Sequence, residues 1–251
     1  NAHKNYSVIC AGAGSSPILL SKLGYRHIKL GKFQIHPTAR ISLIPKERNL
    51  SNEIVDPFQI TEFFPYLMIG SSANREYLSK LNFPLRSNKN IDFSSCINLY
   101  SMAPSEKEGV INLKFPFNGL RTYFLSKDAR DRIKRGLKII TNIASESNLF
   151  KYAYSSSGII NLNDINQKSL NNFLEGTISS SLCSVHIFSS AAAGKNKTIC
   201  PINSDGSVPN YSNVYVMDSS IIPTCPTVNP QSTACLFALS LIRKHIKENV
   251  L

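Results

Sequence analysis

The sequence has no Cys-x-x-Cys pair among its six cysteines. Cys183 and His186 stand three positions apart, but no second pair of metal-ligating residues accompanies them, so we predict no metal site. No apolar run is long enough to span a membrane, and no secretory signal pattern opens the chain. Most of the cysteines have small or apolar neighbours, which is typical of a thiol-reduced protein, and we predict a cytoplasmic location.

Acidic residues are scarce, with 16 Asp and Glu against 28 Lys and Arg, and the formal net charge is +12. A charge of this size is compatible with binding to nucleic acid or to an anionic surface. The basic residues are scattered, however, and one mild cluster from Arg130 to Arg135 has the spacing of a solvated helix face. We therefore predict no nucleic-acid partner.

Hydrophobic residues make up 42% of the 251 positions, which predicts a packed core rather than disorder. A strand–turn–helix piece is predicted over 7–24, and a second one begins at the strand over 214–217. Between them, short β-like runs are combined with helices predicted from Ser126 to about Ser147 and over 167–176. This order of elements predicts a fold of the α/β to α+β class.

The glycine fingerprint of a dinucleotide-binding turn, Gly-x-Gly-x-x-Gly with an acidic residue about 20 positions later, is absent. Gly12 and Gly14 follow a predicted buried strand over 7–11, but Ser or Pro occupies the place of the third glycine. A lone Gly-x-Gly after a strand is weak evidence, so this turn is not interpreted as the primary nucleotide site.

Three segments resemble the glucose–methanol–choline (GMC) family of FAD-dependent oxidoreductases. Residues 11–24 (AGAGSSPILLSKLG) are similar to an AGAxxSPxLL strand–turn–helix of that family, and residues 30–37 (LGKFQIHP) to the VGxxLxxHP that follows it. Residues 213–233 (NVYVMDSSIIPTCPTVNPQST) match NLYVxDxSxxPxxxxxNPQxT nearly position by position, which is long and specific. The resemblance implies an enzyme that oxidises a CH–OH group of an alcohol or a sugar, with FAD as cofactor.

The resemblance also implies a fold in two parts. A partial FAD-binding domain, Rossmann-like and of the GMC type, would comprise 1–34 and 183–251. A substrate-binding domain, built on an antiparallel sheet with flanking helices, would comprise 35–182. The family places its ADP-binding βαβ unit at the N-terminus, and no such unit is found here. We therefore expect a C-terminal fragment of a longer enzyme, which by itself binds FAD weakly or not at all.

His186 and Asn229 are the predicted catalytic residues. In the resembled family, a His at this place removes the hydroxyl proton, the Asn hydrogen-bonds the same oxygen, and hydride passes to flavin N5. Imidazole has a pKa suited to a general base, and an amide that donates to a developing alkoxide stabilises the transition state. Taken singly, His186 is more simply a core histidine and Asn229 a helix cap. The family's Gly-Thr-Cys-x-Met-Gly run is replaced after His186 by residues 187–194 (IFSSAAAG), so an altered pocket wall is expected.

Six residues are predicted to lie beside the cofactor: Gly12, Ala13, Asp218, Ser219, Pro230 and Gln231. Pro230 and Gln231 open the last helix, whose positive N-terminal end would stabilise an anionic reduced flavin. Residues 234–242 are apolar almost all round, which predicts a buried helix. For Asp218 a second explanation stays open, since an Asp here also caps its own turn. His36, before a proline, is interpreted as a buried histidine with satisfied hydrogen bonds.

Two alternatives to an oxidoreductase remain open. One is a flavin-holding lyase of the same fold, and the other is a non-catalytic remnant or a partner-binding module. The presence of both His186 and Asn229 argues against the remnant. The sequence specifies neither the particular alcohol or sugar substrate nor the electron acceptor.

Overall fold

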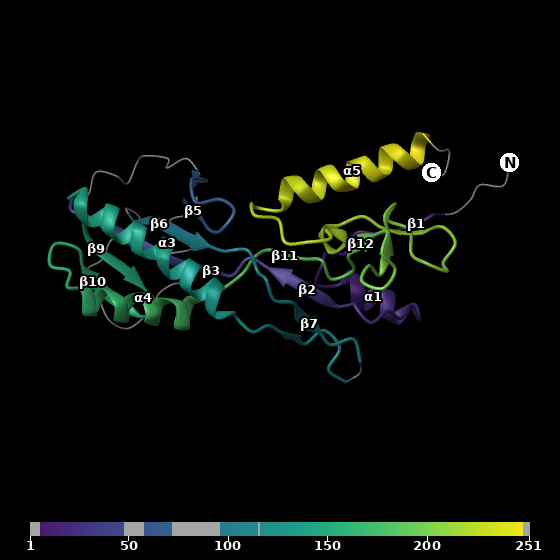
Figure 1. The fold of residues 1–251 in the computed structure, drawn as a ribbon, viewed down its shortest axis with the longest axis horizontal. Coiled ribbons are helices and arrows are strands. Elements are labelled where there is room, and N and C mark those ends of the chain that lie inside the picture. The colour runs from purple at the N-terminus through teal and green to yellow at the C-terminus, as the bar shows by residue number, and fades with distance from the viewer. Residues whose placement is uncertain (1–5, 48–57, 72–95, 115, 248–251) are drawn as a thin grey trace. The chain divides into compact units, whose positions relative to one another are not determined.

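The computed structural model describes residues 6–47, 58–71, 96–114 and 116–247. The chain divides into two compact units, which are traced in Figure 1. Unit 1 comprises Asn1–His36, Ser105–Ser126 and Val185–Leu251, and unit 2 comprises Pro37–Pro104 and Lys127–Ser184. The segment Ser105–Ser126, which the sequence analysis placed in the middle domain, thus lies in unit 1.

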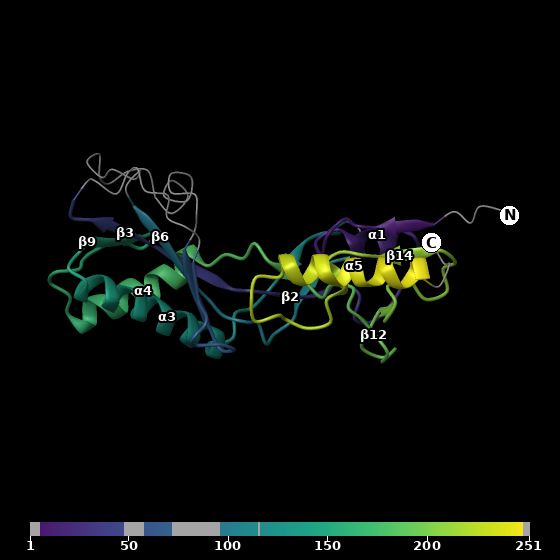
Figure 2. The ribbon, with the colours of Figure 1, turned by 90° about the horizontal axis from the view of Figure 1, so that it is seen from above.

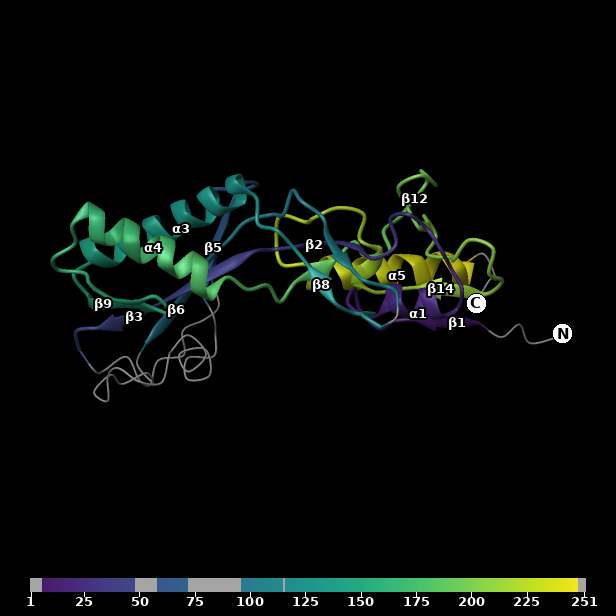
Figure 3. The ribbon, with the colours of Figure 1, turned by 90° about the horizontal axis from the view of Figure 1, so that it is seen from below.

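Unit 2 is an antiparallel sheet with two helices on one face. The strand order is β10–β9–β3–β6–β5–β4, with bounds Gly158–Asn161, Phe150–Ser155, Thr38–Pro45, Ile97–Met102, Met68–Ser71 and Gln59–Ile60. Helices α3 (Lys127–Glu146) and α4 (Gln167–Ser181) both contact β3, and Figures 2 and 3 show them side by side on the same face. The predicted antiparallel sheet with flanking helices is therefore confirmed.

The two helices follow from their side-chain patterns. On α3, buried Ile133, Leu137 and Ile140 recur at helical spacing and face the sheet side. Asn166 caps α4 by accepting a hydrogen bond from the Ser169 backbone N–H at 2.8 Å. The prediction that this helix ends at residue 176 is wrong, because the apolar pattern continues through buried Thr177 and Ile178 to Ser181.

The mild basic cluster lies on α3 and is paired with acidic side chains. Arg130 and Lys134 each lie 2.8 Å from carboxylate oxygens of Glu175 on α4, and Arg132 lies 2.5 Å from Asp128. These pairs are partly exposed, so each contributes at most about 1 kcal/mol to stability. Their positions are those of a solvated helix surface.

Unit 1 holds the segments with the predicted site residues. A four-stranded antiparallel sheet has the order β11–β2–β7–β8, with bounds Ile187–Phe188, Lys32–Ile35, Gly109–Ile111 and Arg121–Thr122. Two parallel strand pairs accompany it: β1 (Ser7–Ile9) with β14 (Val214–Val216), and β12 (Ala193–Gly194) with β13 (Ile202–Asn203). The helical elements are α1 (Ser16–Lys22), the 3₁₀ turn η3 (Ser219–Ile221) and α5 (Gln231–Lys247).

The parallel β1–β14 pair is the centre of the main core of unit 1. Ser7 stands opposite Val214 and Ile9 opposite Val216, so two strands that are far apart in the sequence pair in one sheet. The buried apolar residues of this core come from β14 itself, from α1, β13, η3 and α5, and from a connecting loop, among them Leu20, Leu30, Ile202, Val216, Ile221 and Leu241. The turn after each strand is thereby held at the same edge of the sheet.

Two apolar elements of unit 1 are more exposed than predicted. Val8 on β1 is 45% exposed, and Leu236 and Ile246 on α5 are 66% and 58% exposed. Only Leu241 and His245 of α5 are buried. The prediction of a buried strand and a buried last helix is therefore wrong for the described residues, because apolar elements are buried only where neighbours cover each side. Among the helices that the structure describes, none combines the length and the apolar character needed to cross a membrane.

Candidate functional site

Asp218 joins the turns that follow the two parallel strands. Its Oδ2 accepts hydrogen bonds from the Gly12 backbone N–H at 2.9 Å and from the Ser16 hydroxyl at 2.5 Å. Its Oδ1 accepts from the Ser220 backbone N–H at 2.7 Å and caps η3. The structural explanation for Asp218, a carboxylate that caps its own turn, is therefore correct. The same contacts bring Asp218 and Gly12, two predicted cofactor residues, within hydrogen-bonding distance of each other.

Gly12 and Ala13 form an open turn at the carboxyl end of β1. Gly12 has a φ of +76°, and a Cβ placed on it would meet no atom within 4 Å. The carbonyl of Ala13 accepts a hydrogen bond from the buried Ser190 hydroxyl at 2.6 Å. Ser219, on the facing turn, contributes its carbonyl to the Ser189 backbone N–H at 3.3 Å. Four predicted cofactor residues thus gather where two parallel strands end, which is the edge where α/β sheets bind ligands.

His186 immediately precedes β11 and lies outside the strand. Strand β11 pairs antiparallel with β2, and the two strands are labelled in Figure 1. Ile187 stands opposite Ile35, so the register places His186 opposite His36. The Nδ1 atoms of the two histidines are 3.1 Å apart, and their rings meet edge to face at 89°. His186 is half-buried, whereas His36 is fully buried.

His36 also contacts the loop that leads to α5. Its Nε2 lies 2.5 Å from the backbone carbonyl oxygen of Pro226, and its ring packs edge to face against Phe188. Burial lowers the pKa of His36 to about 4; the Pro226 hydrogen bond opposes this shift, and the neighbouring His186 adds to it. The interpretation of His36 as a buried, hydrogen-bonded histidine is confirmed. Sequence reasoning missed that one of its partners is His186.

Cys225 gives the same loop a second anchor. Its thiol lies 3.8 Å from the carbonyl oxygen of Ile35, and its sulfur accepts from the Ser105 backbone N–H at 3.3 Å. Burial raises the pKa of the Cys225 thiol to about 12, so it stays a neutral thiol. Cys225 and Pro226 are therefore both tied to the end of β2, close in sequence to Asn229.

The start of α5 differs from the prediction by one residue. The helix begins at Gln231, and the carbonyl of Pro230 accepts its first hydrogen bond, from Ala234, at 2.8 Å. Asn229 does not cap the helix, because its Oδ1 is buried and has no hydrogen-bond partner among the described residues. A buried acceptor without a donor costs about 1–3 kcal/mol, which a bound donor would recover. Pro230 and Gln231 have no described hydrogen bond to the Gly12 or Asp218 turns.

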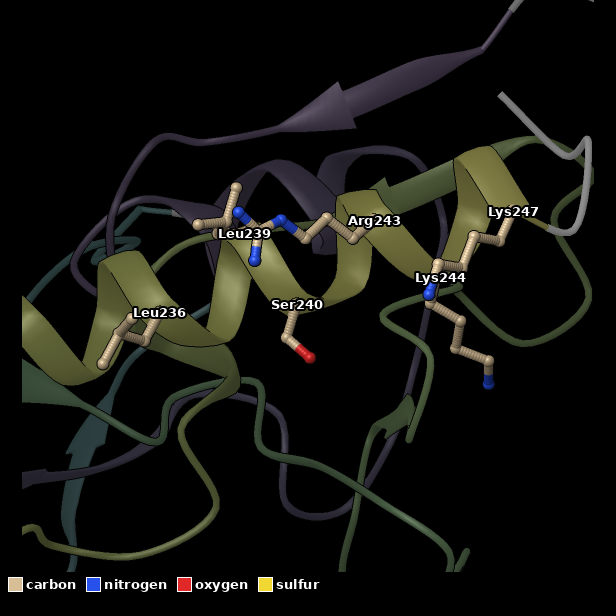
Figure 4. A pocket seen from close by; sticks show the side chains of 6 residues that line it. All are labelled: Leu236, Leu239, Ser240, Arg243, Lys244 and Lys247. Atoms are coloured by element: carbon tan, nitrogen blue, oxygen red, sulfur yellow. The ribbon is translucent and has the colours of Figure 1, made fainter.

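A depression in unit 1 lies along α5. It has a volume of about 530 Å³ and is lined by Leu236, Leu239, Ser240, Arg243, Lys244 and Lys247, as Figure 4 shows. None of the predicted catalytic or cofactor residues lines it. The groups suited to chemistry are instead those around His186 and those at the ends of β1 and β14.

Comparison with known proteins shows a similarity to one family. Residues 119–238 match the family model described as GMC oxidoreductase. Over 93% of its length, the chain is 27% identical to an uncharacterized GMC-type oxidoreductase, y4nJ, of Sinorhizobium fredii, of which it covers 48%. A GMC-type oxidoreductase of Mycobacterium tuberculosis is 38% identical over 60 residues, which are 24% of this chain and 10% of that protein. The chain is therefore similar to the C-terminal part of GMC oxidoreductases.

Solved structures agree with this assignment at the level of the fold. The pyridoxine 4-oxidase of Mesorbium loti superposes with a TM-score of 0.65 and 14% identity, over 96% of this chain and 51% of that one. A formate oxidase variant of Aspergillus oryzae superposes with a TM-score of 0.72 and 10% identity, over 98% and 55%. The predicted mixed fold is therefore confirmed. The chain spans about half the length of y4nJ.

GMC oxidoreductases are FAD-dependent enzymes. The residues of unit 1 fit such a cofactor in part. The Gly12 turn leaves open space where a side chain would otherwise stand, at the carboxyl ends of two parallel strands. The fit does not extend to the pyrophosphate, because the sequence has no Gly-x-Gly-x-x-Gly turn.

Proposed function

We propose that this protein is an FAD-dependent oxidoreductase that oxidises a CH–OH group of an alcohol or a sugar, with His186 as the general base. The observation that carries the proposal is the strand register that sets His186 against His36, together with the bond from His36 to the Pro226 carbonyl. These contacts place the imidazole and the segment that carries Asn229 in one network.

The reaction needs a base and a group that binds the oxygen. A ring nitrogen of His186 takes the hydroxyl proton while the hydrogen on the same carbon leaves with its electron pair, so the alcohol is oxidised to a carbonyl. Bound FAD supplies the acceptor for that hydride. The Asn229 side chain has an amide donor for the developing alkoxide. Its buried Oδ1, which has no partner among the described residues, is available to accept from a different donor group of a bound molecule.

The cofactor is proposed to lie against the Gly12 and Ala13 turn and the Asp218 and Ser219 turn. Asp218 is already engaged by Gly12, Ser16 and Ser220, so its role is to hold the two turns together rather than to bind FAD with its carboxylate. The chain has no pyrophosphate-binding turn, and we propose that a segment outside these 251 residues supplies it.

The test uses the protein expressed from its full reading frame and loaded with FAD. Under anaerobic conditions it is mixed with a panel of primary alcohols, secondary alcohols and sugars, and the flavin absorbance is followed. Bleaching by one class of alcohol is the expected result. A flavin-holding lyase would instead release a carbonyl compound from a cyanohydrin without bleaching, and absence of both reactions would favour a non-catalytic module.

A further inference from the structure

We propose that His36 is a positioning residue that holds His186 in its Nδ1–H tautomer and so makes Nε2 the basic nitrogen of the site. This inference rests on the proposed function for its catalytic meaning, but its structural part stands on the geometry of unit 1. The network that carries it runs from His186 through His36 to the Pro226 carbonyl.

The direction of the network is fixed at its far end. A backbone carbonyl only accepts hydrogen bonds, so the His36 Nε2 that lies 2.5 Å from the Pro226 oxygen carries a proton. Because His36 is fully buried beside Phe188, the neutral ring is favoured, and a neutral imidazole has a single N–H. The Nδ1 of His36 therefore carries no proton and has a lone pair that accepts a hydrogen bond.

That lone pair determines the proton position on His186. Its Nδ1 lies 3.1 Å from the His36 Nδ1, and two lone pairs at this distance would repel each other. The His186 Nδ1 therefore carries the proton and donates a hydrogen bond to the Nδ1 of His36. In neutral His186, Nε2 then holds the lone pair that takes up a substrate proton.

The strand pairing keeps this arrangement in place. Ile35 and Ile187 stand opposite each other in the antiparallel β2–β11 pair, so neither histidine shifts along the chain without breaking the ladder. The ring of His36 has no room to turn away, because it is packed edge to face against both Phe188 and His186. Where a hydrogen-bonded partner orients a metal-ligating histidine, its removal lowers activity by about 10- to 100-fold, and we expect an effect of similar size here.

Two substitutions of similar size and polarity separate positioning from packing. His36→Asn puts an amide oxygen near the place of Nδ1, where it accepts from His186. His36→Gln extends its amide toward the Pro226 carbonyl and leaves no acceptor near Nδ1. If His36 merely filled space, the two variants would behave alike.

The direct readout is the tautomer of His186, measured at neutral pH from imidazole ¹⁵N chemical shifts of the full-length, FAD-loaded protein. The expected result is Nδ1–H in the unsubstituted protein and in His36→Asn, and a shift toward Nε2–H in His36→Gln. His245, which bonds the Asp205 carbonyl through its Nε2 at 2.7 Å, serves as the internal reference for correct folding. An Nε2–H tautomer of His186 in the unsubstituted protein would overturn the proposal without any variant.

Flavin reduction separates this inference from the proposed function. The rate of alcohol-dependent reduction is expected to fall about 10- to 100-fold in His36→Gln and less than tenfold in His36→Asn. Equal losses in both variants, or an unchanged His186 tautomer in His36→Gln, would contradict the positioning role. If the tautomers follow the expectation but no alcohol reduces the flavin, the proposed function fails and the tautomer assignment stands.

Discussion

The backbone N–H of Gly12 donates to Asp218 Oδ2 across 206 positions of the sequence, at a distance of 2.9 Å. This bond joins the turn after β1 to the turn after β14, and the Ser16 hydroxyl reinforces it from the first turn of α1. The carboxylate thus supports the two turns proposed to carry the cofactor.

Replacing Asp218 by Ala is expected to destabilise the protein by about 3 kcal/mol, because three donors lose their acceptor in a partly buried setting. The measurement is the free energy of unfolding in urea. The control is Asp164→Ala, in an exposed loop, which should change stability by less than about 0.5 kcal/mol. Equal effects of the two substitutions would show that the network does not stabilise the turns.

Gly12→Ala is expected to weaken FAD binding out of proportion to its effect on stability. A methyl group at Gly12 meets no described atom of the chain. The expected loss of stability is therefore only that from backbone strain of an alanine at a φ of +76°, about 1 kcal/mol. Gly24→Ala, at a φ of +91°, is the matched control and has no proposed contact with the cofactor.

The measurement for this pair is the FAD dissociation constant of the protein from its full reading frame. A rise of about tenfold or more for Gly12→Ala, with Gly24→Ala close to the unsubstituted value, is the expected pattern. Unchanged FAD affinity in Gly12→Ala would remove the turn from the cofactor site.

Acid is expected to destabilise the protein through His36. The unfolded chain takes up a proton on this residue near its ordinary pKa of 6.5, whereas burial holds the pKa of folded His36 to about 4. Stability therefore falls as the pH drops from 6.5 to 4, by about 3 kcal/mol at ~1.4 kcal/mol per pH unit. Unfolding free energies of the unsubstituted protein and of His36→Gln, compared at several pH values, measure this contribution. Parallel pH profiles for the two proteins would be inconsistent with it.

Cys225 is expected to resist alkylation in the native state. Its pKa of about 12 leaves almost no thiolate at neutral pH, and the thiol is engaged with backbone groups of β2 and Ser105. Cys235, which is exposed, is the internal reference. Mass spectrometry after a short iodoacetamide treatment should find Cys235 modified and Cys225 unmodified. Comparable labelling of both would mean that the loop before Asn229 opens readily.

The sequence predicted the elements with a strong local signal. Helix α3 was anticipated from its apolar spacing, and the helix with Pro17 in its first turn was found at Ser16–Lys22. The resemblance to GMC oxidoreductases rests mainly on one long motif around Asp218 and Asn229, and the family model matches the region that contains this motif. Local patterns sufficed here because capping, helical period and motif are all properties of neighbouring residues.

Contacts between residues far apart in the sequence could not be predicted from the sequence alone. The pairing of His36 with His186 depends on the register of two short strands that lie 150 positions apart, which no local pattern specifies. The exposure of α5 was also missed, since an apolar helix shows only that it needs cover and not which residues of the described chain provide it. Asn229 does not cap α5, and the sequence could not show this either, because the position of Asn229 depends on the loop that Cys225 ties to the end of β2.

The central claim is that His186 removes the substrate proton, and its most direct test is anaerobic flavin reduction by an alcohol substrate in the FAD-loaded protein. In His186→Ala, the rate is expected to fall about 10²- to 10⁴-fold, the usual contribution of a general base. The control is His27→Ala, which should keep the original rate. The described hydrogen bonds of the His27 ring are to the backbone of Lys197 and Lys29. Flavin reduction that proceeds in His186→Ala at the rate of the unsubstituted protein would contradict the account.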